Sequence, residues 1–331
     1  MRKIISLGIV LTILIYLLPI SIQYINNSSD NNFMQDMLSV HANAQIEDEQ
    51  TITVSVDGKP EEMGLEDYIA GVVASEISPD FPIEAIKAQA VAARTYAVYK
   101  ISAGRSDTHP DADVCDDFHH CAAYKPLTEK VASWGDNAEN YENIIMQAVN
   151  DTKDLIITYE NEPIIAVFSA ASGEMTESAK DVWGSDIPYL INVESKGGDA
   201  CSKYKETVTF SLDEFRDIIK KAIPSADLTG KPETWFAASE RSAAGGIKTV
   251  KLGSVQVTGT DLRETLGLNS TNFTVTTSED SISFNTIGYG HGVGLSQYGA
   301  KYLAEQGKTY DEILTHYYQG TQIKSLTEIS E

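Results

Sequence analysis

The sequence has little positive charge for its length. It holds 25 lysines and arginines against 48 aspartates and glutamates in 331 residues, which gives a formal net charge of -23. A mostly negative field repels phosphate groups, which argues against a nucleic-acid groove and against direct binding of anionic cell-wall polymers. A neutral polymer fits better, and sugars are the obvious class because 16 tyrosines and 3 tryptophans supply aromatic faces.

The sequence also lacks an internal repeat and a strict alternation of strands and helices. With 42% hydrophobic residues it can still form one large or two modest domains around real cores. We predict an α+β fold with mostly antiparallel strands rather than a doubly wound sheet. The expected elements are a strand over 51–56 with a turn at Asp57-Gly58, a helix ending at Ser78-Pro79, a second helix from Pro82 packed against the first, a hairpin of 155–159 and 164–168, and capped helices at 211–223 and 309–317.

The N-terminus lacks a small-x-small cleavage site directly after its apolar run. Arg2 and Lys3 precede residues 4–25, which carry no charge and are long enough to span a bilayer, since a spanning helix needs about 20 residues. We therefore favour a retained transmembrane anchor at 1–25, with its N-terminus in the cytoplasm, over a cleaved signal peptide. Residues 26–50 are polar, as in a linker, and 51–325 are expected to form the folded extracytoplasmic domain.

One carboxylate stands where an amphipathic helix would carry an aliphatic residue. Glu76 follows Ile69 by seven residues and Val72 by four, so it leans toward the packed side of the helix that ends at Ser78-Pro79. Apolar surroundings and the negative end of the helix dipole both disfavour ionisation, so such a carboxyl can stay protonated near neutral pH and act as a general acid. The alternative is a glutamate that reaches solvent from a fraying helix end.

A short loop gathers residues that bind metals. Two imidazoles and two thiolates make a complete tetrahedral set for a structural zinc ion. The loop spans 105–125, and the four residues are His109, Cys115, His120 and Cys121. His119 can take the place of His120, and the sequence does not choose between them. The alternative is a Cys115–Cys121 disulfide in an extracytoplasmic compartment, which leaves Cys201 as the odd thiol.

A glycine-rich stretch lies near the C-terminus. Glycines at alternate positions from 288 to 294 surround His291, so that the backbone can adopt unusual angles and a ligand can approach closely. A helix starting near Ser296 would present Gln297 and Tyr298 in its first turn. The alternative is a glycine-rich turn in which His291 is an ordinary hydrogen-bonding residue.

Three stretches carry a resemblance to the stage II sporulation protein D family: VVASEISPDFPIEAIKAQAVAARTYA, VTGTDLRETLGLNSTNF and GYGHGVGLSQYGA. The segment FSAASGEMTESAKDVWGSDIPYL fits between the first and the last, and the resemblance covers about 62–323. It implies that Glu76 is the catalytic glutamate. The substrate-binding residues that it implies are Arg94, Ser172, His291, Gln297 and Tyr298. The family's usual SGG is Ser172-Gly173-Glu174 here, and Ser169 stands where histidine is common, which weakens a binding role for that loop.

The resemblance implies a membrane-anchored lytic transglycosylase that acts on peptidoglycan during spore engulfment. It implies glycan strands without stem peptides as substrate, a wall amidase and a polytopic membrane protein as partners, and a place in the mother-cell membrane facing the space toward the forespore. Ordinary glycosidases use two carboxylates, whereas this chemistry needs one. Glu76 would protonate the oxygen between N-acetylmuramic acid and N-acetylglucosamine, then take the proton of the muramyl C6 hydroxyl, which closes a 1,6-anhydro ring.

Two other functions are compatible with the sequence. A non-catalytic glycan-binding module that activates a partner cell-wall amidase would have the same groove. An inverting hydrolase would need a second carboxylate, such as Asp181 acting as base, but nothing in the sequence ties Asp181 to Glu76. Analysis of the reaction products separates these functions from the first.

Overall fold

The computed structural model describes residues 50–329. The predicted anchor at 1–25 and nearly all of the predicted linker lie outside the described residues, and within 50–329 no helix is long and apolar enough to cross a membrane. Helices combine here with small sheets whose strand pairs are mostly antiparallel. The expected α+β character is confirmed.

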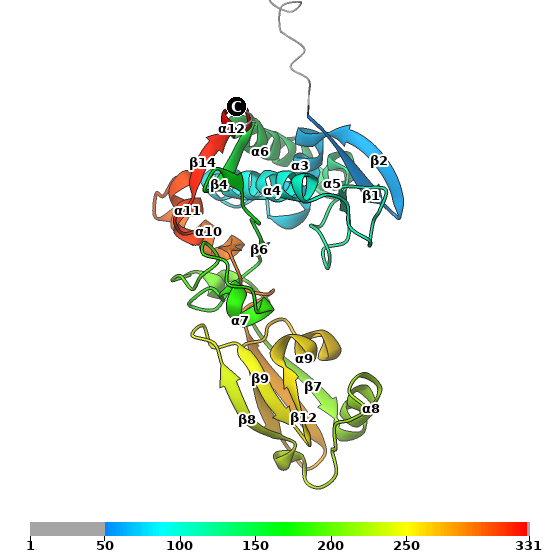
Figure 1. Ribbon diagram of the computed structural model, residues 1–331. Helices are drawn as coiled ribbons and strands as arrows, with labels where there is room; N and C mark the ends of the chain where they lie inside the picture. Colours follow the sequence, from blue (N-terminus) through cyan, green and yellow to red (C-terminus); the bar gives the residue numbers. More distant parts are fainter. Residues whose placement is uncertain (1–49, 330–331) are drawn as a thin grey trace, which may run out of the picture. The chain divides into compact units, whose positions relative to one another are not determined.

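A first hydrophobic core surrounds α4 (Ile83–Ala103), which contacts α3 (Leu65–Glu76), α6 (Ala138–Asp151), α10 (Gln297–Glu305) and α11 (Tyr310–Tyr317). Six alanines of α4 are buried, and their small side chains let the neighbouring helices approach closely. Figure 1 shows α4 running beside α3 and α6. The predicted pair of helices is therefore present, with Pro82 as the cap of α4 rather than its first residue.

Small sheets flank these helices. The strands β1 (Thr51–Val56) and β2 (Lys59–Gly64) form the predicted hairpin, whose turn residues Asp57 and Gly58 have φ of 48° and 76°. The strand β3 pairs with β1 in parallel. The shorter elements in this part of the chain are β3 (Val114–Cys115), α5 (Leu127–Ser133), the 3-10 helix Gly135–Asn137, α7 (Ala179–Trp183), the 3-10 helix Gly198–Ala200 and α12 (Leu326–Ile329).

The second predicted hairpin is only partly correct. The strand β4 (Leu155–Tyr159) pairs antiparallel with β5 (Glu162–Pro163) and with β14 (Gln322–Ser325). Glu160 and Asn161 have φ of 51° and 68°, so the turn needs only two residues and the return strand begins earlier than expected. Residues 164–168, which were expected to form that return strand, instead lead into β6 (Phe168–Ser169). This strand pairs in parallel with β13 (Leu295–Ser296).

A second hydrophobic core is formed by residues 205–287, which we call the inserted region. Its aromatic centre contains Phe215, Trp235, Phe273 and Phe284. Two three-stranded sheets, β10-β9-β8 and β11-β12-β7, and the helices α8 and α9 enclose this centre (Figure 1). The elements are β7 (Lys205–Ser211), α8 (Leu212–Ala222), the 3-10 helix Pro232–Thr234, β8 (Phe236–Arg241), β9 (Ile247–Leu252), β10 (Val255–Thr258), α9 (Gly259–Leu266), β11 (Phe273–Thr277) and β12 (Ser281–Ile287).

The chain enters and leaves the inserted region at one point. The amide of Gly288 donates a hydrogen bond of 2.7 Å to the carbonyl of Tyr204, which joins the residues on either side of the insertion. The chain from Thr51 onward forms one compact unit, within which the buried hydrophobic residues form two clusters. The second cluster has its own aromatic packing and shares none of its buried residues with the first.

The predicted helix caps are confirmed. Ser211 and Glu214 form a capping box at α8, and Thr309 and Glu312 form another at α11. Ser296 caps α10 by accepting a hydrogen bond from the amide of Gly299. This cap fixes the position of the first turn of α10, which carries two of the predicted site residues.

Candidate active site

Glu76 is the last residue of α3. The helix ends there because Ile77 is extended, with φ of -124° and ψ of 146°. The carboxyl is half-buried, and its Oε1 accepts a hydrogen bond of 2.7 Å from the amide of Ala123. Burial raises the pKa of Glu76 above the usual value for a glutamate, and the hydrogen bonds from Ala123 and Gln297 only partly oppose that rise. The group is therefore disposed to hold a proton, as a general acid must.

Gln297 brings the C-terminal motif to this carboxyl. Its Nε2 lies 3.5 Å from Glu76 Oε2, at the long limit for a hydrogen bond, and 3.3 Å from Gln89 Oε1. Gln89 is fully buried on α4, and its own Nε2 has no hydrogen-bond partner within residues 50–329. The two amides hold each other in place beside the acid.

Gln89 is a site residue that the sequence analysis missed. It lies between Ala88 and Ala90 on a helix whose small residues pack against neighbours, and such an alanine-rich pattern indicates a structural helix. A polar amide inside an otherwise apolar buried stretch was the available signal, because such a group is costly to bury without a partner.

Tyr298 lies next to the loop that follows Glu76. Its ring makes an edge contact with Phe81, at 5.1 Å between centroids, and the ammonium of Lys301 lies 5.8 Å from the Phe81 ring. Tyr298 is half-buried. The structure thus brings Gln297 to Glu76 and Tyr298 to Phe81, although Gln297 lies 221 positions along the chain from Glu76.

The glycine-rich stretch contacts protein rather than open space. Gly290 has φ of 114°, and a Cβ there would lie 2.6 Å from Ser169 Cβ. Gly294 has φ of 72°, and a Cβ there would lie 2.2 Å from the carbonyl oxygen of Val167. The close approach that these two glycines permit is made by another segment of the chain, and a ligand at this stretch stays a prediction.

His291 and Ser172 hold this turn in place. His291 Nε2 donates to the carbonyl of Phe168 at 2.9 Å, and its Nδ1 accepts from the amide of Val293 at 3.1 Å. Burial lowers the pKa of His291 to about 4, so the ring is neutral. Ser172 is buried, and its amide donates to Ser296 Oγ at 3.3 Å. Both residues support the segment that leads to Gln297, and neither has a free charged group.

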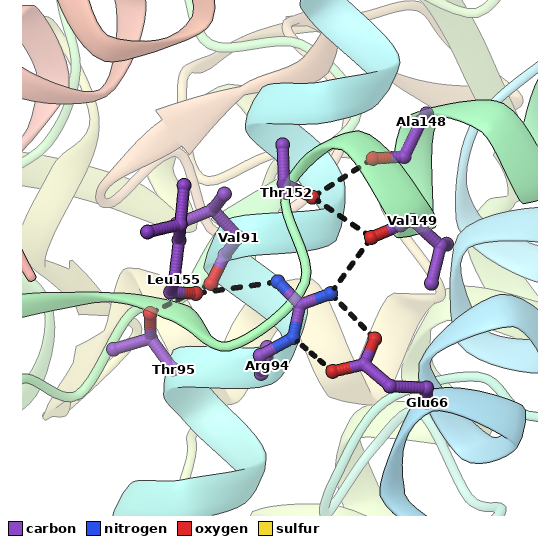
Figure 2. A network of polar contacts seen from close by, with 8 residues as sticks. All are labelled: Glu66, Val91, Arg94, Thr95, Ala148, Val149, Thr152 and Leu155. Atoms are coloured by element: carbon purple, nitrogen blue, oxygen red, sulfur yellow. Dashed lines mark hydrogen bonds and ion pairs between the residues drawn. The ribbon is translucent and has the colours of Figure 1, made fainter. Parts of the chain in front are cut away.

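Arg94 lies inside the first core. Its Nε and Nη2 donate to the two carboxylate oxygens of Glu66 at 2.7 and 2.6 Å (Figure 2). Nη1 donates to the carbonyl of Leu155 at 3.2 Å, and Nη2 donates to that of Val149 at 3.3 Å. The side chain is fully buried, so it exposes no atom to a sugar. This geometry favours a structural role, joining α3, α4, α6 and β4, over the expected substrate contact.

Asp181, the candidate base of an inverting hydrolase, is engaged elsewhere. It accepts a hydrogen bond of 2.9 Å from Ser178 Oγ and forms an ion pair of 3.0 Å with Lys248. Neither the hydrogen bonds nor the charges that act on Glu76 include Asp181. The described residues therefore provide no geometric support for a second catalytic carboxylate at this position.

The metal-binding set is assembled in the loop beside the site. The ligand atoms of His109, Cys115, His120 and Cys121 all lie within 4.8 Å of one another. Cys121 Sγ lies 3.4 Å from His109 Nε2 and 3.3 Å from His120 Nδ1. Cys115 Sγ lies 3.6 Å from His120 Nδ1. Zinc bonds of about 2.3 Å to sulfur and about 2.0–2.1 Å to nitrogen, at the tetrahedral angle, place such atoms about 3.6 Å apart, so the residues fit the ion.

The second nitrogen of each histidine also has a partner. His109 Nδ1 lies 2.8 Å from the carbonyl of Ala112, and His120 Nε2 lies 3.4 Å from Ser106 Oγ. Such contacts fix the tautomer and orientation of metal-binding imidazoles. His119 is instead exposed and bonds to Asp117, so it is His120 that belongs to the cluster.

The three cysteines are free in this structure. Cys115 and Cys121 face the two histidines, and Cys201 is buried apart from them. The disulfide expected as the alternative is therefore absent from residues 50–329. The cluster as it stands is a site that could hold a metal ion.

Comparisons with known proteins agree with the motifs. A family described as "SpoIID: Stage II sporulation protein" matches residues 58–159. The chain is 39% identical over 274 residues to stage II sporulation protein D of Bacillus subtilis (strain 168), covering 83% of this chain and 77% of the relative, and 39% identical over 264 residues to the protein of the same name from Bacillus amyloliquefaciens, covering 80% and 75%. An amidase enhancer of Bacillus subtilis (strain 168) is 29% identical over 305 residues, covering 78% of this chain and 40% of that protein. The chain belongs to the stage II sporulation protein D family.

Proposed function

We propose that the protein is a lytic transglycosylase that cleaves peptidoglycan glycan strands with Glu76 as its single acid and base. The observation that carries the proposal is a half-buried carboxyl with a raised pKa, held by an amide and by Gln297. No other carboxylate is among the groups that act on Glu76 within residues 50–329. Hydrolysis usually employs a pair of carboxylates, whereas transglycosylation does not need the second one.

The proposed reaction uses this one carboxyl group first as an acid and then as a base. Protonated Glu76 gives its proton to the oxygen that links N-acetylmuramic acid to N-acetylglucosamine, and the glycosidic bond breaks. The carboxylate that results takes the proton of the muramyl C6 hydroxyl, whose oxygen bonds to C1 and closes a 1,6-anhydro ring. The proton returns to Glu76 and no water is consumed. In this proposal Gln297, which contacts Glu76, and Tyr298 orient the sugar.

A zinc ion in the histidine and cysteine cluster is part of this proposal. Four protein ligands fill a tetrahedral shell, so the ion supplies structure and leaves no open position for a catalytic water. Ala123 follows Cys121 by two residues and donates the hydrogen bond to Glu76. We therefore expect the ion to hold the loop that positions the acid, which ties the cluster more closely to the site than the sequence predicted.

The setting of the reaction is proposed from the family. An anchor at 1–25 and a linker at 26–50 would hold the folded residues 51–325 outside the membrane, facing the space between mother cell and forespore. Glycan strands without stem peptides, a wall amidase and a polytopic membrane protein would be its partners in engulfment. Retention of the full chain in membranes after a high-salt wash, with protease access only from the outer side, tests the anchor.

A second function has an observation in its favour, which is the similarity to an amidase enhancer. In that case the same groove binds glycan and activates a partner amidase without chemistry. Mass spectrometry of purified glycan strands after incubation with the protein separates the possibilities. Anhydro ends support the transglycosylase, new reducing ends indicate a hydrolase, and intact strands combined with stimulation of an amidase indicate the activator.

A further inference from the structure

A pocket that Glu76 does not line lies between α7 and the inserted region. It has a volume of about 340 Å³, at the small end of the range for ligand sites. One wall comes from the segment 177–184 and the other from β9, β10 and the loops around them. We call it the Glu177 pocket after the buried acid that lines it. None of the functions argued above uses it.

Glu177 is a buried acid with an unused oxygen. Only 7% of the residue is exposed, and its Oε1 accepts a hydrogen bond of 3.0 Å from the amide of Gly246. Its Oε2 forms no hydrogen bond of normal geometry within residues 50–329, although the side chain of Ser242 lies close enough to the carboxyl to act on it as a donor. A Cβ at Gly246 would lie 2.3 Å from Oε1, so only glycine allows this approach. A buried polar atom without a partner is costly, and a ligand that pairs with it removes that cost.

The charges around the Glu177 pocket are already paired. Lys248 lies 3.0 Å from Asp181 and 2.9 Å from Glu240, and Lys180 lies 3.1 Å from Asp186. Both lysines that line the pocket are therefore engaged, and no free cation is left in its lining to bind a phosphate or a carboxylate. A neutral ligand with several hydroxyl or amide groups fits these walls better than an anion.

An aromatic side chain completes the pocket. Trp183 is 43% exposed, one of the few large apolar side chains on the surface, and its ring lies 5.4 Å from the ring of His291. The hydroxyl groups of Thr260 and Thr271 line the same pocket. An exposed indole face beside hydroxyls and a buried acid is a combination that suits a sugar ring, because such a ring is apolar on its faces and polar at its edges.

The pocket is connected to the candidate active site through one short segment. The amide of Glu177 donates a hydrogen bond of 2.8 Å to the carbonyl of Gly292, and Gln297 contacts Glu76. Gly292 and Gln297 are five residues apart, so their Cα atoms lie within about 18 Å of each other. A single glycan strand is long enough to reach both sites.

We propose that the Glu177 pocket binds an N-acetylglucosamine residue of the glycan strand that Glu76 cleaves, at a position remote from the bond that breaks. N-acetylglucosamine is the neutral sugar of the strand, whereas the lactyl carboxylate of N-acetylmuramic acid would meet a buried acid and no free cation. The inference rests on the proposed function for the identity of the strand. It gives the inserted region a role, because that region supplies one wall of the pocket.

The binding test uses the full chain with Glu76→Gln, labelled with 5-fluorotryptophan. The chain has three tryptophans, namely Trp134, Trp183 and Trp235, and fluorine NMR resolves one signal for each. Titration with the β-1,4-linked pentamer of N-acetylglucosamine should shift the Trp183 signal and leave that of Trp235, which is 1% exposed, in place. Shifts in backbone amides near Gln297 without a shift at Trp183 would overturn the inference and leave the proposed function standing.

The kinetic test compares Trp183→Ala with Ile287→Ala, which removes an exposed apolar side chain outside the pocket. Trp183→Ala should raise KM for long strands about tenfold and leave kcat unchanged, because the lost contact binds ground state and transition state alike. Equal KM values for Trp183→Ala, Ile287→Ala and the unmodified chain would contradict the inference. The two proposals can also fail separately. If the sugar shifts the Trp183 signal but the unmodified chain releases no anhydro ends, the sugar site stands and the proposed function is contradicted.

Discussion

The two hydrophobic cores of this protein differ in what they bury. The first core encloses Gln89, Arg94 and Thr95, all fully buried, within helices rich in alanine. The inserted region packs an aromatic centre around Phe284, and its buried polar side chains are hydroxyls, at Ser270, Thr271 and Thr286, with no buried amide or charged group. Buried polar groups fix one geometry at a cost in stability, whereas apolar packing stabilises without directing chemistry. The candidate acid lies in the first core, where the buried amide and the buried charged group are.

The largest expected effect is that of Glu76→Gln, which removes the candidate acid at the first core and leaves the inserted region unchanged. We expect at least a hundredfold loss of anhydro-end formation, since general acid catalysis contributes about 10²–10⁴-fold, with no fall in melting temperature. The matched control is Glu61→Gln, at an exposed position just before the same helix. Normal release of anhydro ends by Glu76→Gln, measured by mass spectrometry, would end the assignment of Glu76.

The metal cluster should connect stability and activity in the first core. His120→Ala is expected to lose the metal, lower the melting temperature and reduce activity, because the loop that carries Ala123 is no longer held. His119→Ala is the matched control, since His119 is an exposed neighbour that is not in the cluster. Metal analysis of protein purified without added zinc checks the first step. An absence of stoichiometric metal, with a Cys115–Cys121 disulfide in the peptide map, would replace the zinc proposal with the oxidised form.

Arg94→Ala tests the buried ion pair with Glu66. Removing one member of such a pair leaves an uncompensated buried charge and costs about 3–5 kcal/mol of unfolding free energy. Lys308→Met breaks an exposed pair with Glu312 and should cost less than about 1 kcal/mol. Chemical denaturation measures both. If Arg94→Ala has normal stability and a raised KM, Arg94 binds substrate and its structural role is wrong.

Phe284→Ala is the corresponding change in the inserted region. Truncating a fully buried phenylalanine should cost about 3–5 kcal/mol, yet the metal content and the turnover of short strands by folded protein should stay the same. Denaturation curves read together with metal analysis check this independence. Loss of metal in Phe284→Ala under conditions where the protein is folded would show that the two cores act as one.

The smallest expected effect is the pH dependence of stability at Glu76. Its pKa is raised in the folded protein, so its contribution to stability is complete below the ordinary glutamate pKa and is lost as pH rises through the folded pKa. Glu76→Gln has no such loss. The melting temperature of Glu76→Gln minus that of the unmodified chain should therefore increase from pH 4 to pH 8. A difference that shrinks with pH would contradict the raised pKa.

Local signals predicted local structure in this chain. The strand at 51–56, the end of α3 and three helix caps follow from turn residues, helix breakers and capping pairs. Glu76 was found because a carboxylate interrupts an apolar stripe. The role of Arg94 could not be read in this way, because its partners Glu66, Val149 and Leu155 are 28 to 61 positions away.

The same limit explains the other differences from expectation. Glycines at 290 and 294 indicate a close approach, but only the fold shows that Ser169 and Val167 make it. The insertion at 205–287 could not be recognised in the sequence, because the sequence patterns of its strands and helices resemble those of the rest of the domain. Its separate core depends on which residues contact one another in the fold. Pairings such as that of Gly288 with Tyr204 cannot be recognised from amino-acid composition.

The contact between Gln297 and Glu76 spans 221 positions, and this has a consequence for when the protein becomes active. At about 5–20 residues per second, a growing chain needs roughly 10–45 s to pass from one residue to the other. The strand pairs of the inserted region involve only residues up to 287, so this region can fold during that interval, whereas the site must wait for α10. A nascent or truncated chain that ends before residue 297 therefore carries the acid without the amide that holds it, and we expect such fragments to be inert toward the wall.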